Sequence, residues 1–206
     1  MTRKFASARQ GVPLVFALAL LLLTASFASA SNITYNVNRL IGAGGTVTGF
    51  IQTDGTIGSL TSANITDWSI VLYTPGQGSY SLFGPSSGNN SVAWSTGADL
   101  SATATQLLFN FSGSDFGVFV LQQGLFSGFH YYCSGTQQAQ NNGYCTQGES
   151  VTPISVYQSG WLSMSESGNV AIGTAANNTT PEPGSLALLG SGIVAAAGML
   201  RRKFMV

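Results

Sequence analysis

Residues 46–60 read TVTGFIQTDGTIGSL, and this stretch decides the class of fold. Threonine, valine, isoleucine and phenylalanine, which suit the pleated surface of a strand, lie on both sides of Asp54–Gly55. An Asp-Gly pair between such runs is typical of a type I′ turn, whose two central residues both need positive φ. The stretch therefore predicts a β-hairpin in which strand 46–53 pairs with strand 56–60.

The same kind of pattern continues along the chain. Apolar residues alternate at 68, 70 and 72, as on the buried face of a strand, and again at 107, 109 and 111. Residues 116–121 are almost continuously apolar, which is typical of a strand buried on both faces. Further strands are predicted at 125–132, 151–157 and 161–165, with loops at the Gly, Ser, Asn and Pro clusters 75–78 and 84–89.

We therefore predict an all-β fold over residues 31–173. Seven or more short strands separated by turn signals favour an antiparallel β-sandwich, of which a jelly roll is one form, with a barrel as the second choice. The segment is long enough for one sizeable core. Residues 174–180, TAANNTT, are polar and small, and they predict a spacer after the domain.

Charge is scarce and unevenly distributed. The basic residues lie near the two ends of the chain, except for Arg39. Residues 31–180 thus hold one basic and six acidic side chains, a formal charge of −5. A domain with one cation cannot neutralise a row of phosphates, so nucleic-acid binding is excluded.

The N-terminus has the three parts of a secretory signal peptide. Basic residues precede an apolar run at 12–23, and a small-residue stretch ends at Ala28-Ser29-Ala30. The run is about 12 residues long, too short to span roughly 30 Å of hydrocarbon. We expect the general secretion machinery to export the chain and a signal peptidase to remove residues 1–30.

The C-terminus combines a stiff motif, an apolar segment and a basic end. Pro181-Glu182-Pro183 is followed by the uncharged segment 184–200 and then by Arg201, Arg202 and Lys203. The segment 184–200 predicts a single transmembrane helix, and the basic residues place its end on the cytoplasmic side. Each proline ring fixes φ, so the motif cannot join the helix and is expected to be extended outside the bilayer.

This ending, residues 181–206, resembles the PEP-CTERM sorting domain. The resemblance implies that a membrane-embedded exosortase cuts the chain near Pro181-Glu182-Pro183, after the inner membrane has held it transiently. It also implies an association with extracellular polysaccharide and biofilm. The alternative is an ordinary C-terminal anchor in which the two prolines occur by chance.

Two cysteines, Cys133 and Cys145, flank a polar segment with a turn signal at Asn142–Gly143. In an exported chain two cysteines so placed predict a disulfide. A redox pair or a metal site would need closer spacing or more ligands. The sequence therefore predicts no metal and no cofactor.

Candidate catalytic residues are few. His130 is the sole histidine, and the chain has no His-Glu-x-x-His or phosphate-loop motif. Paired carboxylates can hydrolyse glycosides, but the sequence alone brings no two acids to a suitable separation. The acids available are Asp54, Asp67, Asp99, Asp115, Glu149 and Glu166.

The sequence thus predicts an exported, non-enzymatic protein of the cell surface or extracellular matrix. The runner-up is a carbohydrate-binding module, in which exposed Trp or Tyr side chains stack on sugars of the extracellular polysaccharide. An enzyme comes third, and it would need a cleft that holds His130 or two of the carboxylates.

Overall fold

The computed structural model of the chain describes residues 31–123, 130–141, 145–153, 162–176 and 192. The described strands belong to one compact unit, Ala30–Asn178. They form two antiparallel sheets, of eight and five strands. The prediction of an all-β fold is confirmed, and the two sheets are consistent with the predicted β-sandwich.

The larger sheet has the strand order β3-β7-β8-β13-β1-β2-β4-β5, so strands from both ends of the domain meet in its middle. The bounds are β1 Ile33–Ile41, β2 Gly45–Thr53, β3 Gly58–Ser59, β4 Ile65–Thr74, β5 Gly78–Phe83, β7 Leu100–Ala102, β8 Gln106–Asn110 and β13 Asn169–Ala175. A 3-10 turn, η2 Ser62–Asn64, precedes β4.

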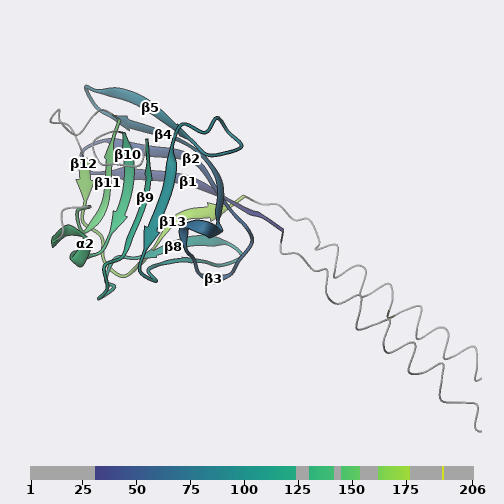
Figure 1. The fold of residues 1–206 in the computed structure, drawn as a ribbon. Coiled ribbons are helices and arrows are strands. Elements are labelled where there is room, and N and C mark those ends of the chain that lie inside the picture. Colours follow the sequence, from purple (N-terminus) through teal and green to yellow (C-terminus); the bar gives the residue numbers. More distant parts are fainter. Residues whose placement is uncertain (1–30, 124–129, 142–144, 154–161, 177–191, 193–206) are drawn as a thin grey trace, which may run out of the picture. The chain divides into compact units, whose positions relative to one another are not determined.

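The smaller sheet has the order β12-β11-β10-β9-β6, and Figure 1 shows its strands lying over β1, β2 and β4. Its bounds are β6 Val92–Thr96, β9 Val118–Gln122, β10 Tyr131–Gly135, β11 Gly148–Thr152 and β12 Leu162–Met164. A short helix, α2 Gln137–Asn141, follows β10.

The main core lies between the two sheets. Trp68, Ile70 and Leu72 on β4 are all buried, as their alternation predicted. They belong to one cluster with Phe119 on β9 and Tyr132 on β10, so both sheets contribute to it. Each large side chain that leaves water there stabilises the fold by roughly 1.5–3 kcal/mol.

The smaller sheet also has a second, outer cluster. Val118 and Val120 point to it from β9, while Cys133, Ala139 and Cys145 cover them. Phe119 and Leu121 of the same strand belong to the main core. The prediction that segment 116–121 is buried on both faces is therefore confirmed for β9, because Ala139 of α2 and Cys145 pack against its outer side chains.

The predicted hairpin at Asp54–Gly55 is wrong. Strand β2 pairs with β1 and β4, whereas β3 pairs with β7. Gly55 has a positive φ of 88°, but Asp54 does not, so the turn is not type I′. Local sequence favoured a hairpin, but the long-range partners of β2 and β3 bury more apolar surface than a two-stranded hairpin could.

Other expectations hold in part. The predicted strands 125–132, 151–157 and 161–165 overlap β10, β11 and β12, while residues 124–129 and 154–161 lie outside the described residues. The last strand, β13, runs to Ala175 and so takes the first two residues of the predicted spacer. Strands β1, β5, β6, β7 and β13 had no prediction.

Candidate functional site

The sorting elements predicted from the sequence lie outside the described residues. These are the signal-peptide residues Ala28 and Ala30, the motif Pro181-Glu182-Pro183, the helix 184–200 and the basic end Arg201, Arg202 and Lys203. Among the residues that the structure does describe, no helix has the length and apolar character needed to span a membrane.

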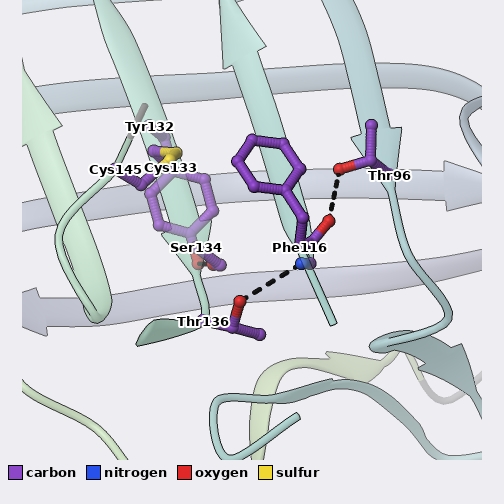
Figure 2. Close-up of a disulfide and its surroundings, with 8 residues drawn as sticks. Thr96, Phe116, Tyr132, Cys133, Ser134, Thr136 and Cys145 are labelled. Carbon is purple, nitrogen blue, oxygen red and sulfur yellow. Dashed lines mark hydrogen bonds between the residues drawn. A yellow bond between two sulfur atoms is a disulfide. The ribbon is translucent and has the colours of Figure 1, made fainter. Parts of the chain in front are cut away.

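The predicted disulfide is within reach of its two cysteines. Cys133 lies on β10 and Cys145 follows α2, and their Cα atoms are 6.2 Å apart. Figure 2 shows the bond between them, and both side chains are buried. Both cysteines belong to the outer cluster, so the bond joins β10 to the residues that follow α2 within that cluster.

Thr136 ties this loop to the turn that leads into β9. Its hydroxyl donates to the carbonyl of Asp115 at 2.8 Å and accepts from the backbone N–H of Gly117 at 3.2 Å. From the other side, the Thr96 hydroxyl donates to the carbonyl of Phe116 at 2.8 Å. Figure 2 shows these threonines on either side of Phe116, so the turn is held by β6 and by the residue that follows β10.

Arg39 joins the two sheets through the buried carboxylate of Glu149. It lies on β1, and its guanidinium donates to Glu149 Oε2, through Nε at 2.8 Å, and to Glu166 Oε1 at 3.0 Å. Glu149 lies on β11 and is fully buried. Tyr132 donates its hydroxyl to the other oxygen of Glu149. We call these four residues the Arg39 cluster.

The ionisation of the Arg39 cluster follows from these contacts. Burial opposes the charge of Arg39, but the hydrogen bond and negative charge of Glu149 outweigh it and raise the Arg39 pKa. Burial, and next the charge of Glu149, raise the pKa of Tyr132 well above its ordinary value. Tyr132 therefore stays a protonated donor, and the cluster is a structural tie with both oxygens of Glu149 engaged.

Residues 97–99, which connect β6 to β7, form a second site with buried charge, and we call them the Asp99 loop. Asp99 lies between β6 and β7 and is only 7% exposed, yet its Oδ2 has no hydrogen-bond partner. Glycines surround the carboxylate, and a Cβ at Gly113 or Gly117 would overlap its oxygens. Desolvation, and then the charge of Asp115, raise the pKa of Asp99.

His130 makes packing contacts. Its ring stacks on Tyr80 with centroids 3.5 Å apart and planes 2° from parallel, and its Nδ1 meets the carbonyl oxygen of Pro153. The carboxylate of Asp67 is also engaged, by the backbone N–H of Ser86 at 3.1 Å and by the hydroxyl of Ser87 at 2.8 Å.

The outer face of the larger sheet mixes hydroxyl and amide groups with exposed apolar side chains. Tyr73 is 41% exposed and Leu40 is 64% exposed. The strand registers place two rows on this face, Leu40, Thr46, Tyr73 and Ser79, and next to it Asn38, Thr48, Val71 and Ser81. We call these two rows the Tyr73 face.

The comparison with known protein families bears on the C-terminus. Residues 179–203 match the PEP-CTERM protein-sorting motif. The chain carries this sorting motif. The resemblance predicted from the sequence is therefore confirmed. Proteins with a PEP-CTERM motif are exported, processed by exosortase and sorted to the cell envelope. Neither the curated proteins nor the solved structures gave a match to the chain.

The PEP-CTERM match includes Pro181, Glu182, Pro183 and the basic residues 201–203, whose individual roles stay predictions. Sequence reasoning missed the Arg39 cluster and the Asp99 loop. The one available signal for the first was that Arg39 is the only cation among so many acids. Across the described part of the chain, no three His, Cys, Asp or Glu side chains gather as a metal cluster.

Proposed function

We propose that this chain is a non-enzymatic protein of the cell surface or extracellular matrix, associated with exopolysaccharide or biofilm. The observation that carries the proposal is the PEP-CTERM match at residues 179–203, directly after a compact β domain. A polar domain joined to a membrane helix stays anchored until the chain is cut. Exosortase supplies the cut, and the released domain is the functional product.

The contacts of the titratable side chains within the domain support a non-enzymatic role. The titratable groups His130, Asp67 and Glu149 all have partners within the fold. In the Arg39 cluster two carboxylates share one guanidinium, and Glu149 is fully buried rather than open to a substrate. Glycoside hydrolysis needs its two carboxyl groups on opposite sides of a bound sugar, so these contacts favour a structural or binding role.

The test replaces Pro181-Glu182-Pro183 with three alanines in a host that has an exosortase. Alanines let the membrane helix extend outward, so we expect full-length protein to accumulate in the inner membrane. Immunoblots of membrane and medium fractions measure this. The matched control, Asn177→Ala with Asn178→Ala, lies just outside the matched segment and should be processed normally. Efficient shortening and release of the triple-alanine protein would show that the tail is only an anchor.

A second function, carbohydrate binding, is favoured by the Tyr73 face. An exposed tyrosine ring offers a stacking surface for a sugar, and the neighbouring Asn, Thr and Ser groups can donate and accept hydrogen bonds. We expect Tyr73→Ala to weaken binding to the host exopolysaccharide by about threefold or more in affinity electrophoresis. Ile57→Ala, which removes exposed but non-aromatic surface outside the Tyr73 face, is the control. Equal retardation of both variants and the wild type would remove this candidate.

A further inference from the structure

The Asp99 loop holds a buried negative charge without a counter-charge. Asp99 is 7% exposed, and its Oδ2 is buried without a hydrogen-bond donor. An unpaired carboxylate in such a place is costly, so proteins rarely keep one without a metal, a cation or a proton. The arrangement therefore requires an explanation beyond packing.

The backbone around Asp99 leaves space for the carboxylate. Gly113 and Gly117 lie against its two oxygens, and any side chain at either position would collide with them. A Cβ at Gly97 would stand 3.1 Å from Oδ2 and 3.3 Å from the carbonyl oxygen of Phe116. Asp99 Oδ2 and the carbonyl oxygen of Phe116 thus both lie next to the space beside Gly97.

A second carboxylate belongs to the same turn. Asp115 lies two residues before Gly117, and its charge acts on Asp99. Its own side chain is exposed, and its carbonyl is held by Thr136. The negative charge of Asp115 thus adds to that of Asp99, and it does so from a turn whose backbone is fixed by hydrogen bonds.

The domain has no cation of its own to offer. Arg39 is the only Lys or Arg between residues 10 and 200, and it is bonded to Glu149 and Glu166. Any positive charge at Asp99 must come from outside the domain.

We propose that the Asp99 loop is a calcium site, in which the carboxylates of Asp99 and Asp115 and the backbone carbonyl of Phe116 bind one Ca²⁺. Calcium takes six to eight oxygen ligands in flexible geometry, and water completes such a shell. All the groups gathered here are hard oxygen donors, which suits Ca²⁺ better than a thiolate- or imidazole-seeking metal. Extracellular calcium modules bind with a Kd of about 10⁻⁴–10⁻³ M.

The test is thermal unfolding of the full chain, purified in mild detergent, with EGTA or with about 10 mM CaCl₂. Ligand that binds only the folded state stabilises it, so we expect Tm to rise by about 3–10 °C for the wild type. Asp99→Asn should lose this rise, because an amide keeps the shape but not the charge. Asp115→Asn, an exposed position that cannot disturb packing, should lose at least half of it.

Two controls separate a site from general screening. Asp54→Asn removes the same charge from a different loop and should keep the full calcium response. MgCl₂ at the same concentration should give little response, because magnesium demands a smaller, near-octahedral shell. Three results would overturn the site: no rise with calcium in the wild type, an equal rise in Asp99→Asn, or an equal rise with magnesium.

Discussion

The Arg39 cluster and the Asp99 loop each hold a buried carboxylate, but they differ in the partners that its oxygens have. Glu149 is fully buried, and both of its oxygens are bonded, to Arg39 and Tyr132. Asp99 is almost as buried, but its Oδ2 has no partner. Arg39, the one cation of the domain, compensates the charge of Glu149, so the charge of Asp99 needs a cation from solution.

Breaking the Arg39 cluster should have the largest effect. Arg39→Met keeps most of the volume but leaves the charge of Glu149 buried and uncompensated. We expect the free energy of unfolding to fall by about 3–5 kcal/mol, measured by urea denaturation. Adding Glu149→Gln to Arg39→Met should recover part of the loss, because the unpaired charge is then gone. If the double variant is no more stable than Arg39→Met, charge is not what the cluster supplies.

Removing the disulfide should have the next largest effect. Cys133 and Cys145 close the loop beside Thr136, and Thr136 holds the turn that carries Asp115. Cys133→Ala with Cys145→Ala should lower stability by about 3 kcal/mol in the same assay. Wild-type protein in excess reductant should match the variant. Equal urea midpoints for oxidised wild type and variant would contradict the role of the bond.

A substitution in the Asp99 loop should raise stability, whereas the two changes above lower it. In EGTA, Asp99→Asn removes a buried charge that nothing compensates, so we expect Tm to rise by about 1–3 °C in a calorimetric scan. A fall in Tm under these conditions would mean that the carboxylate has a partner within the fold.

Replacing Asp54, an acid whose carboxylate has partners near the surface, should have the smallest effect on stability. Its carboxylate accepts hydrogen bonds from the N–H of Thr56 at 3.0 Å and the amide of Asn64 at 3.0 Å, and these lower its pKa. A lowered pKa means that the stabilisation is present above the unfolded pKa and is lost as pH falls through the folded value. Asp54→Asn should therefore unfold at a slightly lower temperature than wild type at pH 7, and the gap should narrow as pH falls to 3. A constant gap in melting curves between those pH values would contradict this.

Local pattern was sufficient wherever a strand alternates or is wholly apolar. The buried face of Trp68, Ile70 and Leu72 and the double burial of β9 could be predicted because hydrophobic periodicity reports directly on burial. Strands such as β6 and β13, which mix Ser, Thr, Ala and Gly with few large apolar residues, carry little of that signal. Their place is set by their neighbours in the sheet.

The sequence by itself determined the sorting tail and the all-β class, because a PEP-CTERM tail is a linear pattern of proline, apolar and basic residues and strand propensity is local. Tertiary structure alone decided the partners of β2 and β3, the union of Arg39 with Glu149 across 110 residues, and the isolation of Asp99 among glycines. The physical reason is that strand pairing and charge burial depend on residues far apart in the chain. Their energies exist only once the two sheets have packed.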